Sequence, residues 1–244
     1  MSLHHELEGD GPVVVLSGSL GATLELWDAQ MEALRRGFRV LRYDHPGHDG
    51  SPLGDLDGVA SLAHGVVELL DELGIERASF CGLSLGGAVG MQLALDAPDR
   101  VDRLVLACTS PRFGDPDFWN ELIDVVRSRG MEAIADVLLP RWFTPAFEDV
   151  QRFREMLLAM PPETYARYCE LLREFDLTGT LDGIRAPTLA IAGAEDPTSP
   201  PAEVEAMAAE IPDSGVLKIE GAAHLANVEQ PASFNQALLA HLTP

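Results

Sequence analysis

Short apolar runs alternate with amphipathic segments along most of the chain. The runs are rich in β-branched and large aliphatic residues and end at small or polar residues, as buried strands do. They cover residues 13–17, 38–43, 78–83, 101–108, 187–192 and 215–219. Segments with apolar residues at helical spacing follow them, at 23–36, 59–73, 85–97, 202–211 and 233–241. This order predicts an α/β fold with a mostly parallel sheet and helices on both faces.

One long segment departs from this alternation. Between residues 114 and 182 no strand pattern occurs, and helical patterns follow one another at 118–129, 131–139, 148–160 and 162–174. Because the strand–helix order resumes afterwards, the segment interrupts the sheet domain without ending it. We therefore expect a core domain formed by residues 1–113 and 183–244, with a helical cap at 114–182.

Composition narrows the class of protein. The chain has 244 residues, 46% of them hydrophobic, and no apolar run approaches the roughly 18 to 20 residues that cross a bilayer. The first residues show neither a basic segment nor a long apolar stretch, so they do not resemble a secretory signal. These features predict a cytoplasmic globular protein. The oligomeric state stays open, a homo-oligomer included.

The formal net charge of −22 disfavours nucleic acid and anionic membranes as partners, because phosphate groups would be repelled. An anionic substrate would need a local positive field. Nine arginines lie between residues 112 and 185, and we interpret most of them as charged groups on solvated helix faces rather than as a binding site. The three cysteines are too scattered for a disulfide framework or a zinc site, and we expect buried thiols, no metal and no cofactor.

Residues 82–86, Gly-Leu-Ser-Leu-Gly, match the G-x-S-x-G pattern between a predicted strand and a predicted helix. In this pattern a serine occupies a strained turn, so Ser84 is the candidate nucleophile. Side chains at either glycine position would crowd the turn, and a β-carbon there would also block the substrate. The following helix points the N–H of Leu85 toward a developing oxyanion.

A serine nucleophile needs a base that is oriented by an acid, and in this pattern both come later in the chain. Asp196 and His224 each follow a predicted strand and are the candidate acid and base, with Glu195 as the alternative acid. The five histidines before Ser84 fail this order. A second oxyanion donor is expected from the loop after the first predicted strand, where Leu20 N–H is preferred and Ser19 N–H is the alternative.

These stretches together resemble the α/β-hydrolase superfamily and, within it, the 3-oxoadipate enol-lactonases. The similarity runs almost end to end, through residues 19–27, 38–44, 80–87, 141–147 and 221–231. The cap stretch and the Ser-Leu-Gly loop narrow the family to the lactonases. Two positions depart from the family pattern: Gly18 stands where an Asn is usual, and Asp49 where a Gly is usual. The resemblance also implies a cap inserted after the sixth strand.

By this resemblance the chain opens the ring of an anionic enol-lactone. Arg141 would bind the substrate carboxylate, Trp142 would form a wall of the pocket, and Ser19 would contact the substrate. A general carboxylesterase, a C–C bond hydrolase and a cofactor-free perhydrolase use the same three catalytic residues and remain alternatives. A silent binding protein with this fold is the alternative outside enzymes.

Overall fold

The computed structural model describes residues 2–243, which contain a seven-stranded sheet in the order β1-β3-β2-β4-β5-β6-β7. The strands are β1 (His5–Glu8), β2 (Val13–Ser17), β3 (Arg39–Tyr43), β4 (Ala78–Leu83), β5 (Val101–Ala107), β6 (Thr188–Gly193) and β7 (Ser214–Ile219). All neighbouring strands pair in parallel except β1, which runs antiparallel to β3. The predicted α/β architecture is confirmed, and β1 is an additional edge strand.

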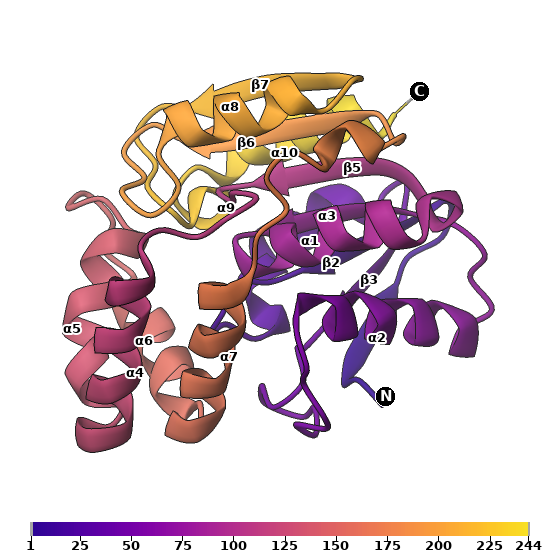
Figure 1. Cartoon of the computed structure of the whole chain (residues 1–244). Coiled ribbons are helices and arrows are strands. Elements are labelled where there is room, and N and C mark those ends of the chain that lie inside the picture. The colour runs from indigo at the N-terminus through magenta and orange to yellow at the C-terminus, as the bar shows by residue number, and fades with distance from the viewer. Residues whose placement is uncertain (1, 244) are drawn as a thin grey trace.

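Helices cover both faces of the sheet. The α-helices are α1 (Asp28–Leu34), α2 (Val59–Glu72), α3 (Leu85–Asp96), α4 (Pro116–Arg129), α5 (Met131–Trp142), α6 (Val150–Ala159), α7 (Pro162–Glu174), α8 (Pro201–Glu210), α9 (Ala226–Glu229) and α10 (Pro231–Leu242). Short 3₁₀ helices are η1 (Leu24–Trp27), η2 (Pro98–Arg100) and η3 (Leu181–Gly183). Helices α2, α3 and α8 pack on one face, and α1 and α10 pack on the other (Figure 1).

The core lies on both sides of the central strands. Leu16, Phe80, Leu106 and Ile191, one from each of four neighbouring strands, are at most 1% exposed. Strands covered on both faces read as continuous apolar runs, which is why their positions could be predicted from the sequence. All three cysteines are buried free thiols, as expected.

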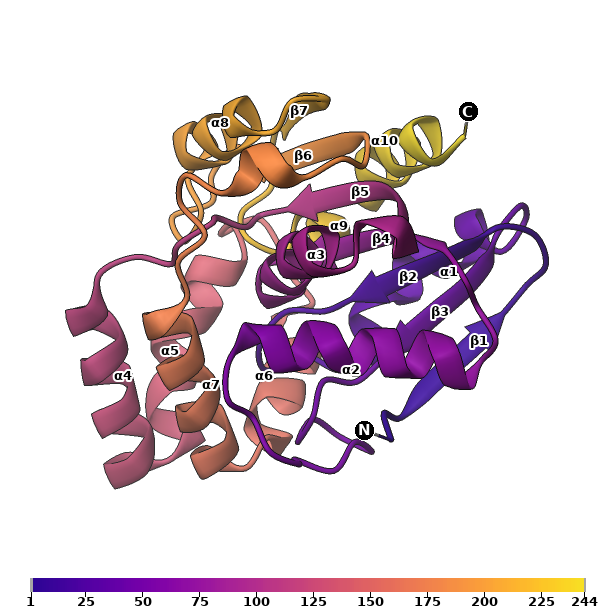
Figure 2. The ribbon, with the colours of Figure 1, turned by 45° about the vertical axis from the view of Figure 1, so that its right-hand side comes forward.

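Helices α4 to α7 lie between β5 and β6 in the chain and group together at one end of the sheet (Figures 1 and 2). They occupy the segment expected to form the cap. Within residues 2–243 this insertion follows the fifth strand, β5. The expectation that it follows a sixth strand is therefore wrong by one strand. No helix within residues 2–243 is long and apolar enough to cross a membrane.

Candidate active site

Ser84 occupies a strained turn between β4 and α3. Its backbone has φ 56° and ψ −114°, which non-glycine residues rarely adopt. The N–H of Ser84 donates to the carbonyl oxygen of Ala107 (2.9 Å), and the Thr109 hydroxyl donates to the carbonyl oxygen of Ser84 (2.8 Å). Neighbouring strand ends therefore hold the turn, and the strain is offset by the packing around it.

The two glycines of the turn are required by close backbone contacts. A β-carbon at Gly82 would overlap the carbonyl of Gly86, and one at Gly86 would overlap the carbonyl of Ser17 at the end of β2. The expected crowding is thus confirmed. The nearest obstructed atoms belong to the protein backbone, so close packing of the turn is a sufficient reason for these glycines. The expected block of the substrate stays a prediction.

Three side chains from separate loops form one hydrogen-bonded line. Nε2 of His224 lies 2.8 Å from Oγ of Ser84, and Nδ1 of His224 lies 2.8 Å from Oδ2 of Asp196. Ser84, Asp196 and His224 are 7%, 3% and 2% exposed. The loops after β4, β6 and β7 meet here because parallel strands end at the same edge of the sheet. The arrangement can move a proton from a serine hydroxyl to an imidazole.

The structure distinguishes the two candidate acids. The free oxygen of Asp196, Oδ1, accepts N–H groups from Thr198 (2.7 Å) and Ser199 (3.1 Å). These bonds orient its other oxygen toward His224. Glu195 is exposed, and among the described residues it forms no side-chain hydrogen bond with His224 or Ser84. Asp196 is therefore the residue that can orient the histidine.

Hydrogen bonds connect the backbone on each side of His224 to residues at the end of α5. The N–H of Ala223 donates to Oε2 of Glu229 (2.6 Å), while Oε1 of Glu229 accepts the N–H and the hydroxyl of Thr144 (2.8 and 2.7 Å). The N–H of the residue after His224 donates to the carbonyl of Trp142 (3.0 Å). These contacts explain how two stretches of the family resemblance meet in space.

A cavity of about 320 Å³ opens above Ser84, between the strand-end loops and helices α4, α5 and α7. It is lined by the predicted site residues Ser19, Leu20, Ser84, Arg141, Trp142 and His224. Most of the remaining lining is apolar, and Trp119, Leu138 and Tyr165 are at most 8% exposed. The cavity has the apolar walls and few convergent polar groups that are typical of small-molecule sites.

Arg141 lies at this cavity without a carboxylate partner. Its Nη2 donates to the carbonyl of Pro197 (3.1 Å), and its guanidinium lies 5.4 Å from the ring centroid of Phe118. Among the described residues it forms no ion pair, unlike Arg127, which bridges two glutamates. Most of its N–H donors are thus available to a bound anion.

The loop after β2 places Leu20 at the cavity. The N–H of Ala22 donates to the carbonyl of Ser19 (3.2 Å) across a turn whose third residue, Gly21, has φ +78°. Since the peptide is trans, the N–H of Leu20 points away from that carbonyl. Leu85 is the first residue of α3. Within residues 2–243 neither N–H has a hydrogen-bond acceptor.

Two buried histidines that sequence reasoning set aside hold this loop. Nε2 of His45 lies 3.1 Å from the carbonyl oxygen of Gly18, and Nε2 of His48 accepts the N–H of Gly21 (3.1 Å). Burial lowers the pKa of His45 to about 4 and that of His48 to about 3, so both are neutral. Their position before Ser84 excluded a role as base, and no local sequence signal indicated a bracing role.

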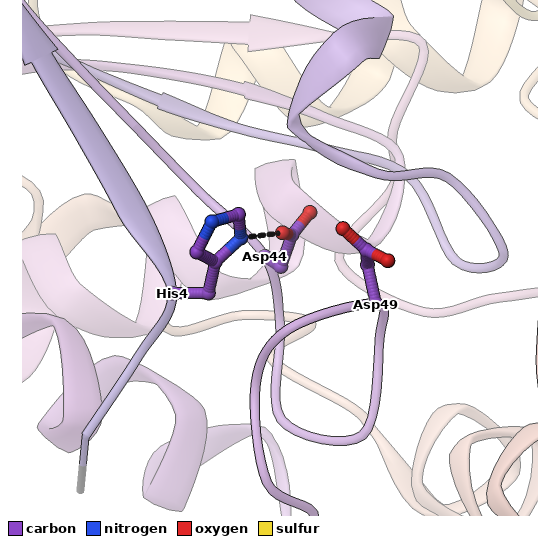
Figure 3. A group of neighbouring side chains, drawn as sticks. All are labelled: His4, Asp44 and Asp49. Atoms are coloured by element: carbon purple, nitrogen blue, oxygen red, sulfur yellow. Dashed lines mark hydrogen bonds and ion pairs between the residues drawn. The ribbon is translucent and has the colours of Figure 1, made fainter.

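Away from Ser84, residues 2–243 contain one cluster whose side chains have the chemistry to hold a divalent cation. His4, Asp44 and Asp49 each offer a ligand atom, and these atoms lie within 4.8 Å of one another (Figure 3). Both oxygens of Asp44 already accept hydrogen bonds, from His4 (2.6 Å) and from the N–H of Leu24 (2.7 Å). Burial raises the pKa of Asp44, and the hydrogen bond to Asp44 raises that of His4. We interpret the cluster as a polar contact between the N-terminal segment and the loop that follows β3.

Known proteins are similar to this chain over nearly its whole length. A 3-oxoadipate enol-lactonase of Acinetobacter baylyi is 36% identical over 95% of this chain and 88% of its own length. RutD of Stutzerimonas stutzeri, named as a carbamate hydrolase, is 34% identical over 98% of this chain and 95% of its own. The crystal structure of the enol-lactonase from Burkholderia xenovorans superposes with a TM-score of 0.95 at 35% identity, covering 99% of this chain and 96% of that one. The α/β-hydrolase fold family matches residues 11–231, and the chain belongs to this family.

Proposed function

We propose that the chain is a serine hydrolase that opens the lactone ring of 3-oxoadipate enol-lactone to give 3-oxoadipate, a step of aromatic catabolism. The observation that carries the proposal is the line Ser84–His224–Asp196 at a cavity of about 320 Å³. Similarity to two enol-lactonases over nearly the whole chain supports the substrate class.

The reaction begins when His224 accepts the hydroxyl proton of Ser84 and the serine oxygen attacks the lactone carbonyl. Asp196 holds the imidazole in the required tautomer and stabilises the imidazolium. The N–H groups of Leu20 and Leu85 stabilise the negative charge that develops on the carbonyl oxygen. Collapse of the tetrahedral intermediate breaks the ring C–O bond and leaves an acyl-enzyme.

The leaving oxygen is an enolate that stays tethered to the acyl chain. An enolate leaves more readily than an alkoxide, so protonation by His224 matters less in this step than it does for an ordinary ester. The enolate takes the proton that His224 removed from Ser84, which leaves an enol and a neutral imidazole. Hydrolysis of the acyl-enzyme then becomes the slow step: His224 removes a proton from the attacking water and returns it to the Ser84 oxygen as the acyl group leaves. The released enol tautomerises to the ketone.

Arg141 is proposed to bind the substrate carboxylate through paired hydrogen bonds. The cavity also borders Asp115 and Glu203, and the chain as a whole is strongly acidic, so an anionic substrate needs a nearby cation. Replacing Arg141 with Ala should raise KM for the lactone about tenfold or more and leave the hydrolysis of a neutral aryl ester unchanged. Arg129→Ala is the matched control, because Arg129 is exposed on α4 and does not line the cavity. Equal losses on both substrates would contradict the role.

Hydrolysis of a carbamate is the second candidate, because the RutD relative is similar over nearly the full length of both chains. The carbamate anion is much smaller than the cavity and would leave most of its apolar wall unfilled, which favours the lactone. An ultraviolet assay of enol-lactone loss, run beside p-nitrophenyl acetate hydrolysis and ammonia release from carbamate, separates the candidates. We expect the lactone to have the highest kcat/KM. Faster turnover of carbamate, or of the simple ester, would overturn the assignment.

A further inference from the structure

The loop that presents Leu20 is anchored through both of its peptide groups. The carbonyl of Ser19, in the peptide before Leu20, accepts the N–H of Ala22. The N–H of Gly21, in the peptide after Leu20, donates to Nε2 of His48 at 3.1 Å. Because each peptide group is planar, these two bonds together fix the backbone of Leu20 and the direction of its N–H.

The start of the same loop is held from two sides. The carbonyl of Gly18 lies 3.1 Å from Nε2 of His45 and also accepts the N–H of Gly86 in α3 (3.0 Å). This carbonyl can only accept, so His45 carries its proton on Nε2. The N–H of Gly21 can only donate, so His48 carries its proton on Nδ1, facing the carbonyl of Pro46 (3.4 Å). The two neighbouring imidazoles are thus in opposite tautomers.

Packing prevents either ring from turning. The ring of Tyr168, from α7, lies edge-on to His48 at 5.0 Å and to His45 at 6.4 Å between centroids. The Tyr168 hydroxyl donates to the carbonyl of Pro46 (2.8 Å), and the ring of Tyr43 packs against His45 at 5.2 Å. Both histidines are at most 2% exposed. A loop that carries a candidate oxyanion donor is therefore braced by rings from other parts of the chain.

We propose that His48, supported by His45, is a positioning residue that aims the N–H of Leu20 at the oxyanion of the transition state. This inference rests on the proposed role of Leu20 in the serine hydrolase mechanism. His48 does not touch the substrate, since it does not line the cavity above Ser84. It acts through the Gly21 peptide, whose N–H it accepts.

The test compares His48→Gln with His48→Met. The two side chains are similar in length, but only Gln places an oxygen where Nε2 of His48 accepts the Gly21 N–H. We expect His48→Met to lower kcat for p-nitrophenyl acetate by about 10- to 100-fold, below the full loss of an oxyanion donor, with KM changed less than about twofold. A trifluoromethyl ketone, which forms an oxyanion on the serine, should bind more weakly by the same factor. His48→Gln should recover most of both losses.

The same pair of substitutions at His241 is the control, because His241 is a partly buried histidine that bonds the carbonyl of Pro187 and does not line the cavity. Thermal unfolding reports whether each variant is folded. Equal kcat for His48→Met and His48→Gln, or equal losses at His241, would overturn the inference.

A measurement on the unaltered protein tests the same contact when a variant does not fold. The ¹⁵N shifts of the imidazoles should show the proton on Nδ1 of His48 and on Nε2 of His45, and the reverse assignment for His48 would contradict the bracing bond. If the unaltered protein hydrolyses no ester, the proposed function fails, whereas these tautomers still decide whether His48 accepts the Gly21 N–H.

Discussion

The Ser84 turn and the Leu20 loop lie at the ends of neighbouring strands and face the same cavity, yet they are held in different ways. The turn is fixed by backbone contacts, with glycines where β-carbons would overlap carbonyl groups. The loop is fixed largely by the side chains of His45 and His48, which come from the segment after β3.

This difference explains why the structure of the Ser84 turn could be predicted from the local sequence, whereas the support of the Leu20 loop could not. Close backbone approach requires glycine at fixed spacings, which leaves a pattern around Ser84. Bracing by buried rings requires only that some side chain with the right donor or acceptor reaches the loop. That requirement does not fix a residue type at a set spacing from the loop, so the residues of the loop alone do not reveal it.

The largest effect is expected from a change in the triad, the hydrogen-bonded line of Ser84, His224 and Asp196, at a residue that lies outside both the Ser84 turn and the Leu20 loop. Asp196→Asn should lower kcat by about 10⁴-fold, because the amide stabilises the wrong tautomer of His224. Glu195→Gln is the control and should leave kcat within about twofold. Adding His48→Met to Asp196→Asn should lower the residual rate further, since the oxyanion donors act independently of the triad. No further loss in the double variant would mean that the loop and the triad do not act separately.

The next effect tests the backbone contacts of the turn. Gly86→Ala should lower the unfolding free energy by about 3 kcal/mol or more, because the new methyl group overlaps the carbonyl of Ser17 and the strand or helix must move. Gly37→Ala is the matched control, as nothing lies within 4 Å of the added atom. Urea denaturation gives both values. A similar stability for the two variants would show that the turn is not held by close approach.

The smallest effect is a decrease of the unfolding free energy in mild acid, which we assign to His45 and His48, the two histidines bonded to the Leu20 loop. An unfolded histidine binds a proton below pH 6.5, whereas His45 and His48 stay neutral in the fold down to about pH 4 and about pH 3. The unfolded state then binds more protons, so the unfolding free energy falls as pH decreases from 6.5, by at most about 1.4 kcal/mol per pH unit for each histidine.

Urea denaturation near pH 7 and near pH 5.5 measures this slope. His48→Gln should reduce it by the share of one histidine. His241 has a lowered pKa and adds to the slope, while His4 has a raised pKa and opposes it from a mostly exposed position. An unchanged slope in His48→Gln would contradict a buried, neutral His48.

Most of the fold and the line of three catalytic candidates could be predicted from the sequence. The central strands are continuous apolar runs, and Asp196 and His224 stand in the order that the serine pattern requires. Strand β1 was missed because His5–Glu8 contains one apolar residue and pairs only at the sheet edge. The bracing by His45 and His48 depends on contacts that form only after folding.

The central claim is that Ser84 is an activated nucleophile. Incubation with a fluorophosphonate followed by intact mass measurement and peptide mapping tests it most directly. The account predicts a single adduct on the peptide that contains Ser84, and no adduct on Ser84→Ala. A folded protein that gains no label, or gains it on another residue, would contradict the account.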